Sequence, residues 1–263
     1  MTYVFYSLIC LLATTLGAIS GIGGGVIIKP VLDATASLSV SQISFLSGCS
    51  VLAMSVVSLI SSTGGEAKID KLRTTPLAIG SAVGGVVGKL VFDVIKKSAG
   101  NDGVVGTVQS IIMIILTAGV LLYVLNKKHI KTNNVSSVFV CLALGLVLGV
   151  LSSFLGIGGG PINLAVLYFF FSMNTKTAAL NSLYMILFAQ SASLIYSFAS
   201  ASIPETDYLS LAVMIISGVI GGFVGRKINK KMSSRAVDIL FCCMLVAIVA
   251  ISFFNLVKYI SII

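Results

Sequence analysis

The stretch Ser20-Gly21-Ile22-Gly23-Gly24-Gly25 returns 135 positions later as Leu155-Gly156-Ile157-Gly158-Gly159-Gly160. Three further landmarks keep the same order. Ser47 aligns with Ser182, Ser58-Leu59-Ile60 aligns with Ser193-Leu194-Ile195 and, after two inserted residues, Gly84-Gly85-x-x-Gly88-Lys89 aligns with Gly221-Gly222-x-x-Gly225-Arg226. Matches in one order over most of the chain indicate an internal repeat. We place the first repeat at 1–133 and the second at 134–263, within a single transmembrane domain.

The composition around these motifs is that of a protein whose solvent is lipid. Of the 263 residues, 57% are hydrophobic and only 10% are charged, whereas soluble domains carry about 25% charged residues. Stretches 40–62, 104–126 and 177–199 have no charged residue, and each exceeds the roughly 20 residues that a helix needs to cross a bilayer. Because lipid cannot hydrogen-bond to the backbone, we expect an all-α polytopic membrane protein.

Each half has the same order of segments. An apolar segment (4–19, then 136–153) precedes the glycines, a short segment (26–33, then 161–171) follows them, and three long spans complete the half. The glycines could kink one tilted helix, which gives four spans per half and parallel repeats. They could instead form the tip of a helical hairpin, partly or fully inserted, which gives inverted repeats.

Basic residues distinguish the two topologies because they accumulate on the cytoplasmic side of short loops. The kinked-helix topology divides them almost evenly between the two sides. The hairpin topology leaves Lys96, Lys97 and Lys258 on one side and places twelve on the other: Lys68, Lys71, Arg73, Lys127, Lys128, Lys131, Lys176, Arg226, Lys227, Lys230, Lys231 and Arg235. We therefore predict ten helical segments in two inverted repeats, each a glycine-tipped hairpin plus three spans, with both termini outside the cell.

The net charge of +9 follows from these loop residues, so it indicates membrane orientation and not nucleic-acid binding. The five cysteines lie within apolar segments without metal-ligand spacing and are expected to be small apolar fillers. Residues 1–20 have the apolar length of a signal peptide but no basic start, so they are expected to be retained as the first helix.

The glycine tips are the strongest candidates for a binding site. Glycine leaves backbone N–H groups uncovered, and the helix that follows each tip directs its positive dipole end toward the tip. Together these features bind anions, and broken helices at the midplane of inverted repeats commonly hold a transporter's substrate. The predicted tip residues are Gly21, Gly23, Gly24, Gly25, Gly156, Gly158, Gly159 and Gly160. Close helix packing is the alternative, and we favour it for the glycines of 84–88 and 218–225.

Polar residues inside the apolar segments could add neutral hydrogen-bond donors to such a site. The candidates are Ser20, Ser47, Ser50, Ser153, Asn163, Asn181, Ser182 and Gln190. Interhelical hydrogen bonding is the alternative for each of them. Lys29 could attract an anion, but it lies about two turns beyond the glycines, so extension to the membrane surface is favoured. Asp33 is expected at the interface.

Nothing in the sequence assembles an enzyme site. The single histidine, His129, lies in a basic loop, and no paired carboxylates or metal ligands come together within the apolar segments. The motifs also lack the Gly-Lys-Ser/Thr of a nucleotide-binding loop. We expect no enzyme activity, no cofactor and no metal, and the sequence leaves the coupling ion open.

Two Gly-Ile-Gly-Gly-Gly motifs, one per half, in a chain of this length resemble the TauE/SafE sulfite exporter family. The resemblance covers essentially the whole chain. Pro30 follows the first motif as is common in that family, whereas Pro161 directly follows the second. The resemblance implies a plasma-membrane transporter of sulfite, sulfonates or related organic oxyanions, usually outward.

These observations predict a secondary transporter of small anions that works by alternating access around the two tips. A passive anion channel and a non-transporting receptor or scaffold are the alternatives. The expected partners are a small anionic solute and the lipid bilayer, and a homodimer is compatible with the sequence.

Overall fold

The computed structural model describes residues 2–63, 67–127 and 129–261, and over these ranges the chain forms ten α-helices and no strand. Lys128, one of the basic loop residues counted above, lies outside the described residues. The helices are α1 (Thr2–Ser20), α2 (Gly25–Thr35), α3 (Val40–Ile60), α4 (Lys71–Ala99), α5 (Asp102–Asn126), α6 (Val138–Phe154), α7 (Pro161–Phe171), α8 (Thr175–Ala199), α9 (Tyr208–Lys231) and α10 (Ser234–Ile260).

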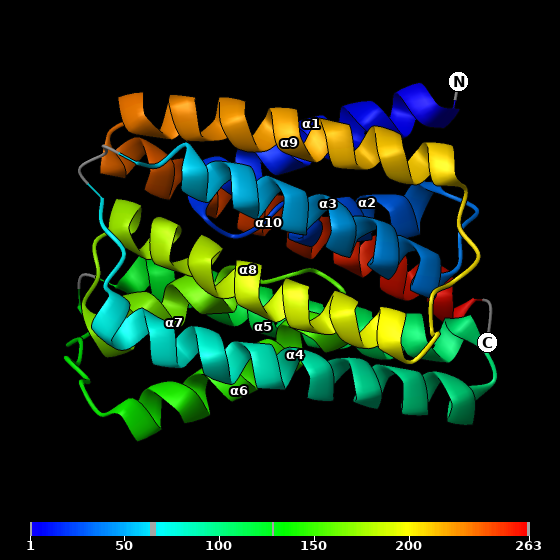
Figure 1. Ribbon diagram of the computed structural model, residues 1–263, viewed down its shortest axis with the longest axis horizontal. Helices are drawn as coiled ribbons and strands as arrows, with labels where there is room; N and C mark the ends of the chain where they lie inside the picture. Colours follow the sequence, from blue (N-terminus) through cyan, green and yellow to red (C-terminus); the bar gives the residue numbers. More distant parts are fainter. Residues whose placement is uncertain (1, 64–66, 128, 262–263) are drawn as a thin grey trace.

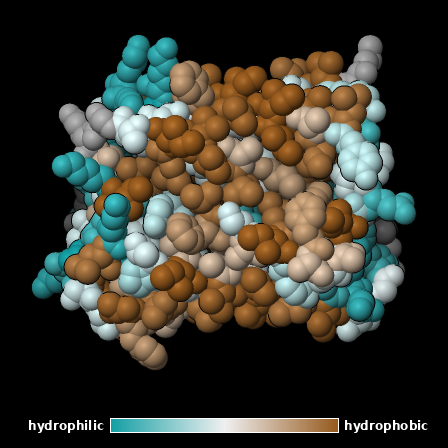
Figure 2. Space-filling view, viewed as in Figure 1, coloured by the Kyte–Doolittle hydropathy of each residue, from teal (hydrophilic) through white to brown (hydrophobic). Residues whose placement is uncertain are grey.

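Seven of these helices are long and apolar enough to cross a membrane. They run roughly along the long axis of the molecule (Figure 1). Figure 2 shows an apolar central band with hydrophilic residues gathered at both ends of this axis. The all-α polytopic membrane fold predicted from the sequence is confirmed.

The long helices begin with side chains that cap their first amides. In α3, Ser39 and Gln42 form a reciprocal capping box, and Asn174 accepts a hydrogen bond from Thr177 N at the start of α8. Side chains also cap α4, α5, α9 and α10. The short helices α2 and α7 differ, because each begins after a glycine that offers no side chain. No side chain therefore caps the first turn of either helix, and in α7 the first residue, Pro161, has no N–H to satisfy.

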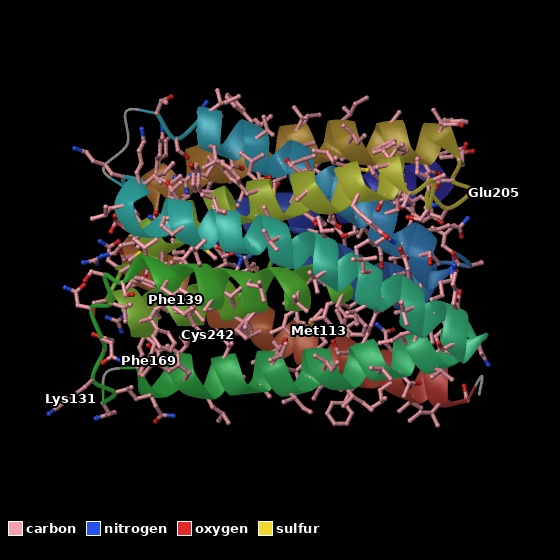
Figure 3. All side chains as sticks on the ribbon, turned by 60° about the horizontal axis from the view of Figure 1, so that its bottom comes forward. Met113, Lys131, Phe139, Phe169, Glu205 and Cys242 are labelled. Atoms are coloured by element: carbon pink, nitrogen blue, oxygen red, sulfur yellow. The ribbon has the colours of Figure 1, made fainter. Side chains whose placement is uncertain are left out.

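Both glycine motifs form the turn of a hairpin. Phe139 near the start of α6 and Phe169 near the end of α7 lie at the same end of the molecule as Lys131, opposite Glu205 (Figure 3). Asn133 N donates to Phe169 O at 2.7 Å across the mouth of this hairpin. The α1–α2 hairpin opens toward the opposite end, where α1 begins and α10 ends (Figure 1). The two hairpins thus enter the bundle from opposite faces.

The two halves of the sequence exchange helices in space. Helix α4 of the first half packs mainly on α6 and α8 of the second, while α9 of the second half packs on α1 and α3 of the first. One group of helices therefore contains α4, α6 and α8, and another contains α9, α1 and α3. Contacts between α3 and α8 join these groups, and α5 packs against α10 (Figure 1). Each tip is therefore flanked by a long helix from the other half of the sequence.

Glycines allow these exchanged helices to touch. A Cβ atom on Gly84 of α4 would overlap Leu146 O of α6, and one on Gly221 of α9 would lie 3.0 Å from Leu11 O of α1. Such close approach of backbones is typical of membrane helices with small residues at their interface. The packing role predicted for the glycines of 84–88 and 218–225 is confirmed at these positions.

Candidate anion site at the two glycine tips

The tip backbone uses conformations that favour glycine. Gly21 and Gly23 have φ values of +83° and +82°, and Gly156 and Gly158 have +65° and +69°. Residues with a side chain rarely adopt this left-handed region. The two motifs therefore begin their turns in the same way, and a side chain at these four positions would strain both turns. They differ afterwards, because Gly24 has a helical φ of −65° whereas its counterpart Gly159 has a φ of +137°.

The tips meet inside the bundle. A Cβ atom on Gly25 at the start of α2 would overlap Ile157 O of the second tip, and one on Gly23 would lie 3.8 Å from Gly158 O. Each tip also touches the long helix of the other half: Gly21 lies against Ala179 of α8, and Gly156 lies against Ser44 of α3. The same offset of 135 residues relates the two glycines and their two partners.

Few tip amides are used within the protein. Gly21 N donates to Gly17 O, and Gly156 N and Ile157 N donate to Ser153 O and Ser152 O. Within the described ranges, no hydrogen bond is formed by the N–H groups of residues 22–24 or 158–160. These donors lie at the positive ends of α2 and α7, where an anion is stabilised.

Three of the polar residues predicted for the binding site have a buried side-chain atom without a hydrogen-bond partner in the described part of the chain. Ser47 and Ser182, which the repeat relates to each other, are fully buried, and neither hydroxyl has a hydrogen-bond partner among the described residues. Ser47 Oγ would lie 2.9 Å from a Cβ atom on Gly25. Asn163 in the first turn of α7 is also buried with an unpartnered Oδ1. An unsatisfied buried polar group costs about 1–3 kcal/mol, so these groups are candidates to bind a ligand.

Three other predicted residues already have partners in the protein. Ser20 Oγ donates to Leu16 O and Ser50 Oγ donates to Leu46 O, each within its own helix. Asn181 Oδ1 accepts from Asp70 N and from the Thr74 hydroxyl, while its Nδ2 donates to Lys68 O and Thr177 O. Asn181 thus ties α8 to the start of α4, and its amide has no donor left for an anion.

Ser153 and Gln190 line a cavity of about 30 Å³ beside the second tip. Ser153 Oγ lies 2.9 Å from Ser193 Oγ, and Gln190 Nε2 would lie 2.7 Å from a Cβ atom on Gly158. Gly156 also lines this cavity. The volume holds only one or two water-sized groups, so an oxyanion would need the cavity to widen slightly.

Lys89, which is not among the predicted site residues, places a positive charge next to the second tip. Its side chain lines both the 30 Å³ cavity and a polar vestibule of about 620 Å³. Its Nζ lies 3.1 Å from Asp93 Oδ1 and 4.8 Å from the centre of the Phe92 ring. One feature of the sequence could have indicated Lys89. The repeat aligns Gly88-Lys89 with Gly225-Arg226, so both halves have a basic residue next to a packing glycine.

The vestibule lies at one end of the bundle and shares Lys89 with this cavity. Lys96 and Lys97 at the end of α4 line it, together with Tyr196 and Ser200 around the end of α8 and the loop residues 202–204. This is the end at which Glu205 lies (Figure 3). Three lysines against one aspartate make the route electropositive, which attracts anions.

The expectation that Lys29 extends to the membrane surface is wrong. Lys29 and Asp33 of α2 form an ion pair of 2.9 Å, and their side chains are only 3% and 7% exposed. Lys29 therefore does not extend to the membrane surface, and Asp33 is enclosed by protein. They line a cavity of about 10 Å³ with Gln109, Ser252 and Asn255. Pairing lowers the cost of burying both charges, so protein contacts replace water here.

The described residues contain no group of three or more His, Cys, Asp or Glu side chains that could hold a metal ion. The chemistry available at the tips is therefore neutral hydrogen-bond donors, helix dipoles and Lys89.

Known proteins resemble this chain over most of its length. The chain is 24% identical over 273 residues to the "Probable membrane transporter protein YunE" of Bacillus subtilis (strain 168), covering 94% of this chain and 96% of that protein. No solved structure matches the chain. The family described as "Sulfite exporter TauE/SafE" matches over residues 6–252. The chain, with its paired glycine tips, is therefore a membrane transporter that belongs to the TauE/SafE sulfite exporter family.

Proposed function

We propose that this protein is a secondary transporter that exports sulfite, sulfonates or related small organic oxyanions across the plasma membrane. The observation that carries the proposal is the meeting of two helix N-termini, with free amides and the unpartnered hydroxyls of Ser47 and Ser182. An oxyanion has several acceptor oxygens and would satisfy these donors together. The family description supports the same class of substrate.

The orientation follows from charge. We assign to the cytoplasm the end of the molecule at which Lys131 and most of the described basic loop residues lie. This assignment places both termini and the vestibule outside. In this orientation the structure is an outward-facing state. Alternating access then requires the vestibule to close while the opposite face opens.

A carrier fits the geometry better than a channel. The cavity that Gly156 lines is only about 30 Å³, far smaller than the vestibule of about 620 Å³, and the two tips touch between Gly25 and Ile157. An open pore would need a continuous path past this contact. The test is uptake of labelled sulfite and sulfonates into proteoliposomes. A carrier gives saturable flux and counterflow, whereas flux linear in concentration without counterflow would indicate a channel, and no flux of any oxyanion would reject transport.

A thermal-shift panel in detergent identifies the substrate class independently of transport. Sulfite and sulfonates are expected to raise the unfolding temperature, because a ligand that binds only the folded state stabilises it. Sulfate, carboxylates and bicarbonate complete the panel. If carboxylates alone shift the temperature, the sulfur-oxyanion assignment is wrong while the anion site remains.

Ser47→Ala and Ser182→Ala should separate function from stability. Each change removes a buried hydroxyl without a described partner, so the unfolding temperature should stay the same or rise. Transport should fall about three- to tenfold for each, the value of one hydrogen bond. Ser55→Ala is the matched control on α3, because Ser55 Oγ donates to Leu52 O within the helix. Equal transport by all three variants would remove the two serines from the site.

Lys89→Gln should lower oxyanion transport on the order of 10- to 100-fold, because it removes a charge-assisted contact next to the tip. Lys176→Gln removes one positive charge at the other end of the bundle and should leave transport unchanged. The measurement is initial uptake rate against substrate concentration. A rate for Lys89→Gln like that of the wild type would show that the vestibule is not the substrate route.

A further inference from the structure

Arg226 is a buried cation without a counter-ion. Its side chain is 2% exposed, and no carboxylate in the described part of the chain lies within ion-pair distance. Nη1 donates to Asn229 Oδ1 at 3.1 Å, while Nε has no described partner. Asn229 in turn donates to Ile19 O, just before the first tip. The protein thus holds a guanidinium beside Gly21 with an unused donor.

The repeat makes Arg226 the counterpart of Lys89. Gly88 packs against Val150 O of α6, and Gly225 packs against Thr15 O of α1, with the same offset of 135 between the two partners. Arg226 therefore stands next to the first tip as Lys89 stands next to the second.

The two counterparts differ in access. Lys89 faces the vestibule of about 620 Å³, whereas Arg226 and the residues of the first tip line none of the four cavities that surround Lys89, Lys29 and the second tip. A buried charge without a partner is costly. An anion that binds Arg226 in another conformational state of the protein would offset this cost.

We propose that Arg226 binds the transported oxyanion in the opposite-facing state, at a second access site by the first tip that opens from the cytoplasmic face. This inference rests on the proposed transport function. The guanidinium can hold a sulfite or sulfonate group through two parallel hydrogen bonds. Lys89 binds the anion when the site is open to one face, and Arg226 binds it when the site is open to the other. The two repeats thus supply equivalent basic residues in the two states.

Charge removal at Arg226 gives the first test. Arg226→Gln should reduce transport on the order of 10- to 100-fold, and Arg226→Lys should restore part of it. The unfolding temperature of Arg226→Gln should not fall, because the change removes an uncompensated buried charge. Lys227→Gln is the control, since it removes the neighbouring exposed lysine. A lower unfolding temperature with normal transport in Arg226→Gln would show a structural role and overturn the proposal.

Sidedness gives the second test. Ser58 Oγ lies 3.4 Å from Gly222 O, one turn before Arg226, and the repeat relates Ser58 to Ser193 in the 30 Å³ cavity. Ser58→Cys and Ser193→Cys are introduced singly after the five native cysteines are replaced. A membrane-impermeant anionic methanethiosulfonate should label Ser193→Cys from the vestibule face and Ser58→Cys from the opposite face, and sulfite should slow both reactions.

The outcomes separate this inference from the proposed function. Labelling of Ser58→Cys only from the vestibule face, or from neither face, overturns the Arg226 site even when the wild-type protein transports oxyanions. Absence of oxyanion transport by the wild-type protein, with opposite sidedness intact, rejects the substrate and leaves the two access sites standing.

Discussion

Gly25→Ala is expected to abolish oxyanion transport, with a loss of at least about 100-fold. The added Cβ would overlap Ile157 O of the opposite tip and would lie 2.9 Å from Ser47 Oγ. Because Gly25 occupies an ordinary helical position at the start of α2, alanine is favoured there by the backbone. The expected loss therefore comes from the contact between the tips, and proteoliposome uptake of sulfite measures it.

Gly119→Ala is the matched control for this experiment. Gly119 lies within α5, and a Cβ atom there would meet nothing within 4 Å. The same substitution should leave transport unchanged and should raise stability by at most about 1 kcal/mol. If Gly25→Ala and Gly119→Ala transport equally well, the close meeting of the tips is not needed for binding, and the oxyanion site must be sought elsewhere.

The fold could be predicted because two signals in the sequence have a direct physical cause. The glycine motifs break the first helix of each half, since several of their residues need positive φ. The distribution of the basic loop residues then indicates that each half crosses the membrane an odd number of times. An odd number requires the broken helix to form a hairpin. Together these signals predict ten helices and opposed tips, and the structure has both.

The rotation of each helix about its axis could not be predicted in the same way. In a soluble protein the apolar face marks the core, but a membrane helix is apolar toward both lipid and protein. Helix α4 shows the difficulty, because Val83 and Val87 are exposed while Leu77 and Ala78 are buried. The sequence therefore identified polar residues within the membrane but not which of them face a ligand.

The candidate site was predicted in part for this reason. The sequence predicts Asn181 and Ser182 for the same site, yet Asn181 binds the start of α4 while the hydroxyl of Ser182 has no described partner. Asp70 and Thr74 lie 111 and 107 residues from Asn181 in the sequence, so no local pattern indicated this pairing. The ion pair of Lys29 with Asp33 differs, because the two residues lie one turn apart on α2 and their spacing alone allowed it to be predicted.

Gly84→Val is expected to lower the stability of the protein substantially. Helices α4 and α6 touch through their backbones, since a Cβ atom on Gly84 would overlap Leu146 O and would lie 2.9 Å from Val150 N. Overpacking of this kind costs about 1–3 kcal/mol, which corresponds to roughly 2–10 °C in unfolding temperature for a chain of this size. Thermal unfolding in detergent, followed by size-exclusion chromatography, measures the shift.

Two further variants show whether the loss arises from the interface or from valine itself. Gly119→Val adds the same side chain where there is open space and should change the unfolding temperature little. Gly221→Val alters the corresponding contact of α9 with α1, where the added atoms would meet Thr14 and Leu11, and should destabilise the protein as Gly84→Val does. Because α6 and α1 carry the two tips, both interface variants should also lose transport. If either variant kept the wild-type unfolding temperature, the close backbone contact of that helix pair would not contribute to stability. That contact could then not be what holds the tip in position.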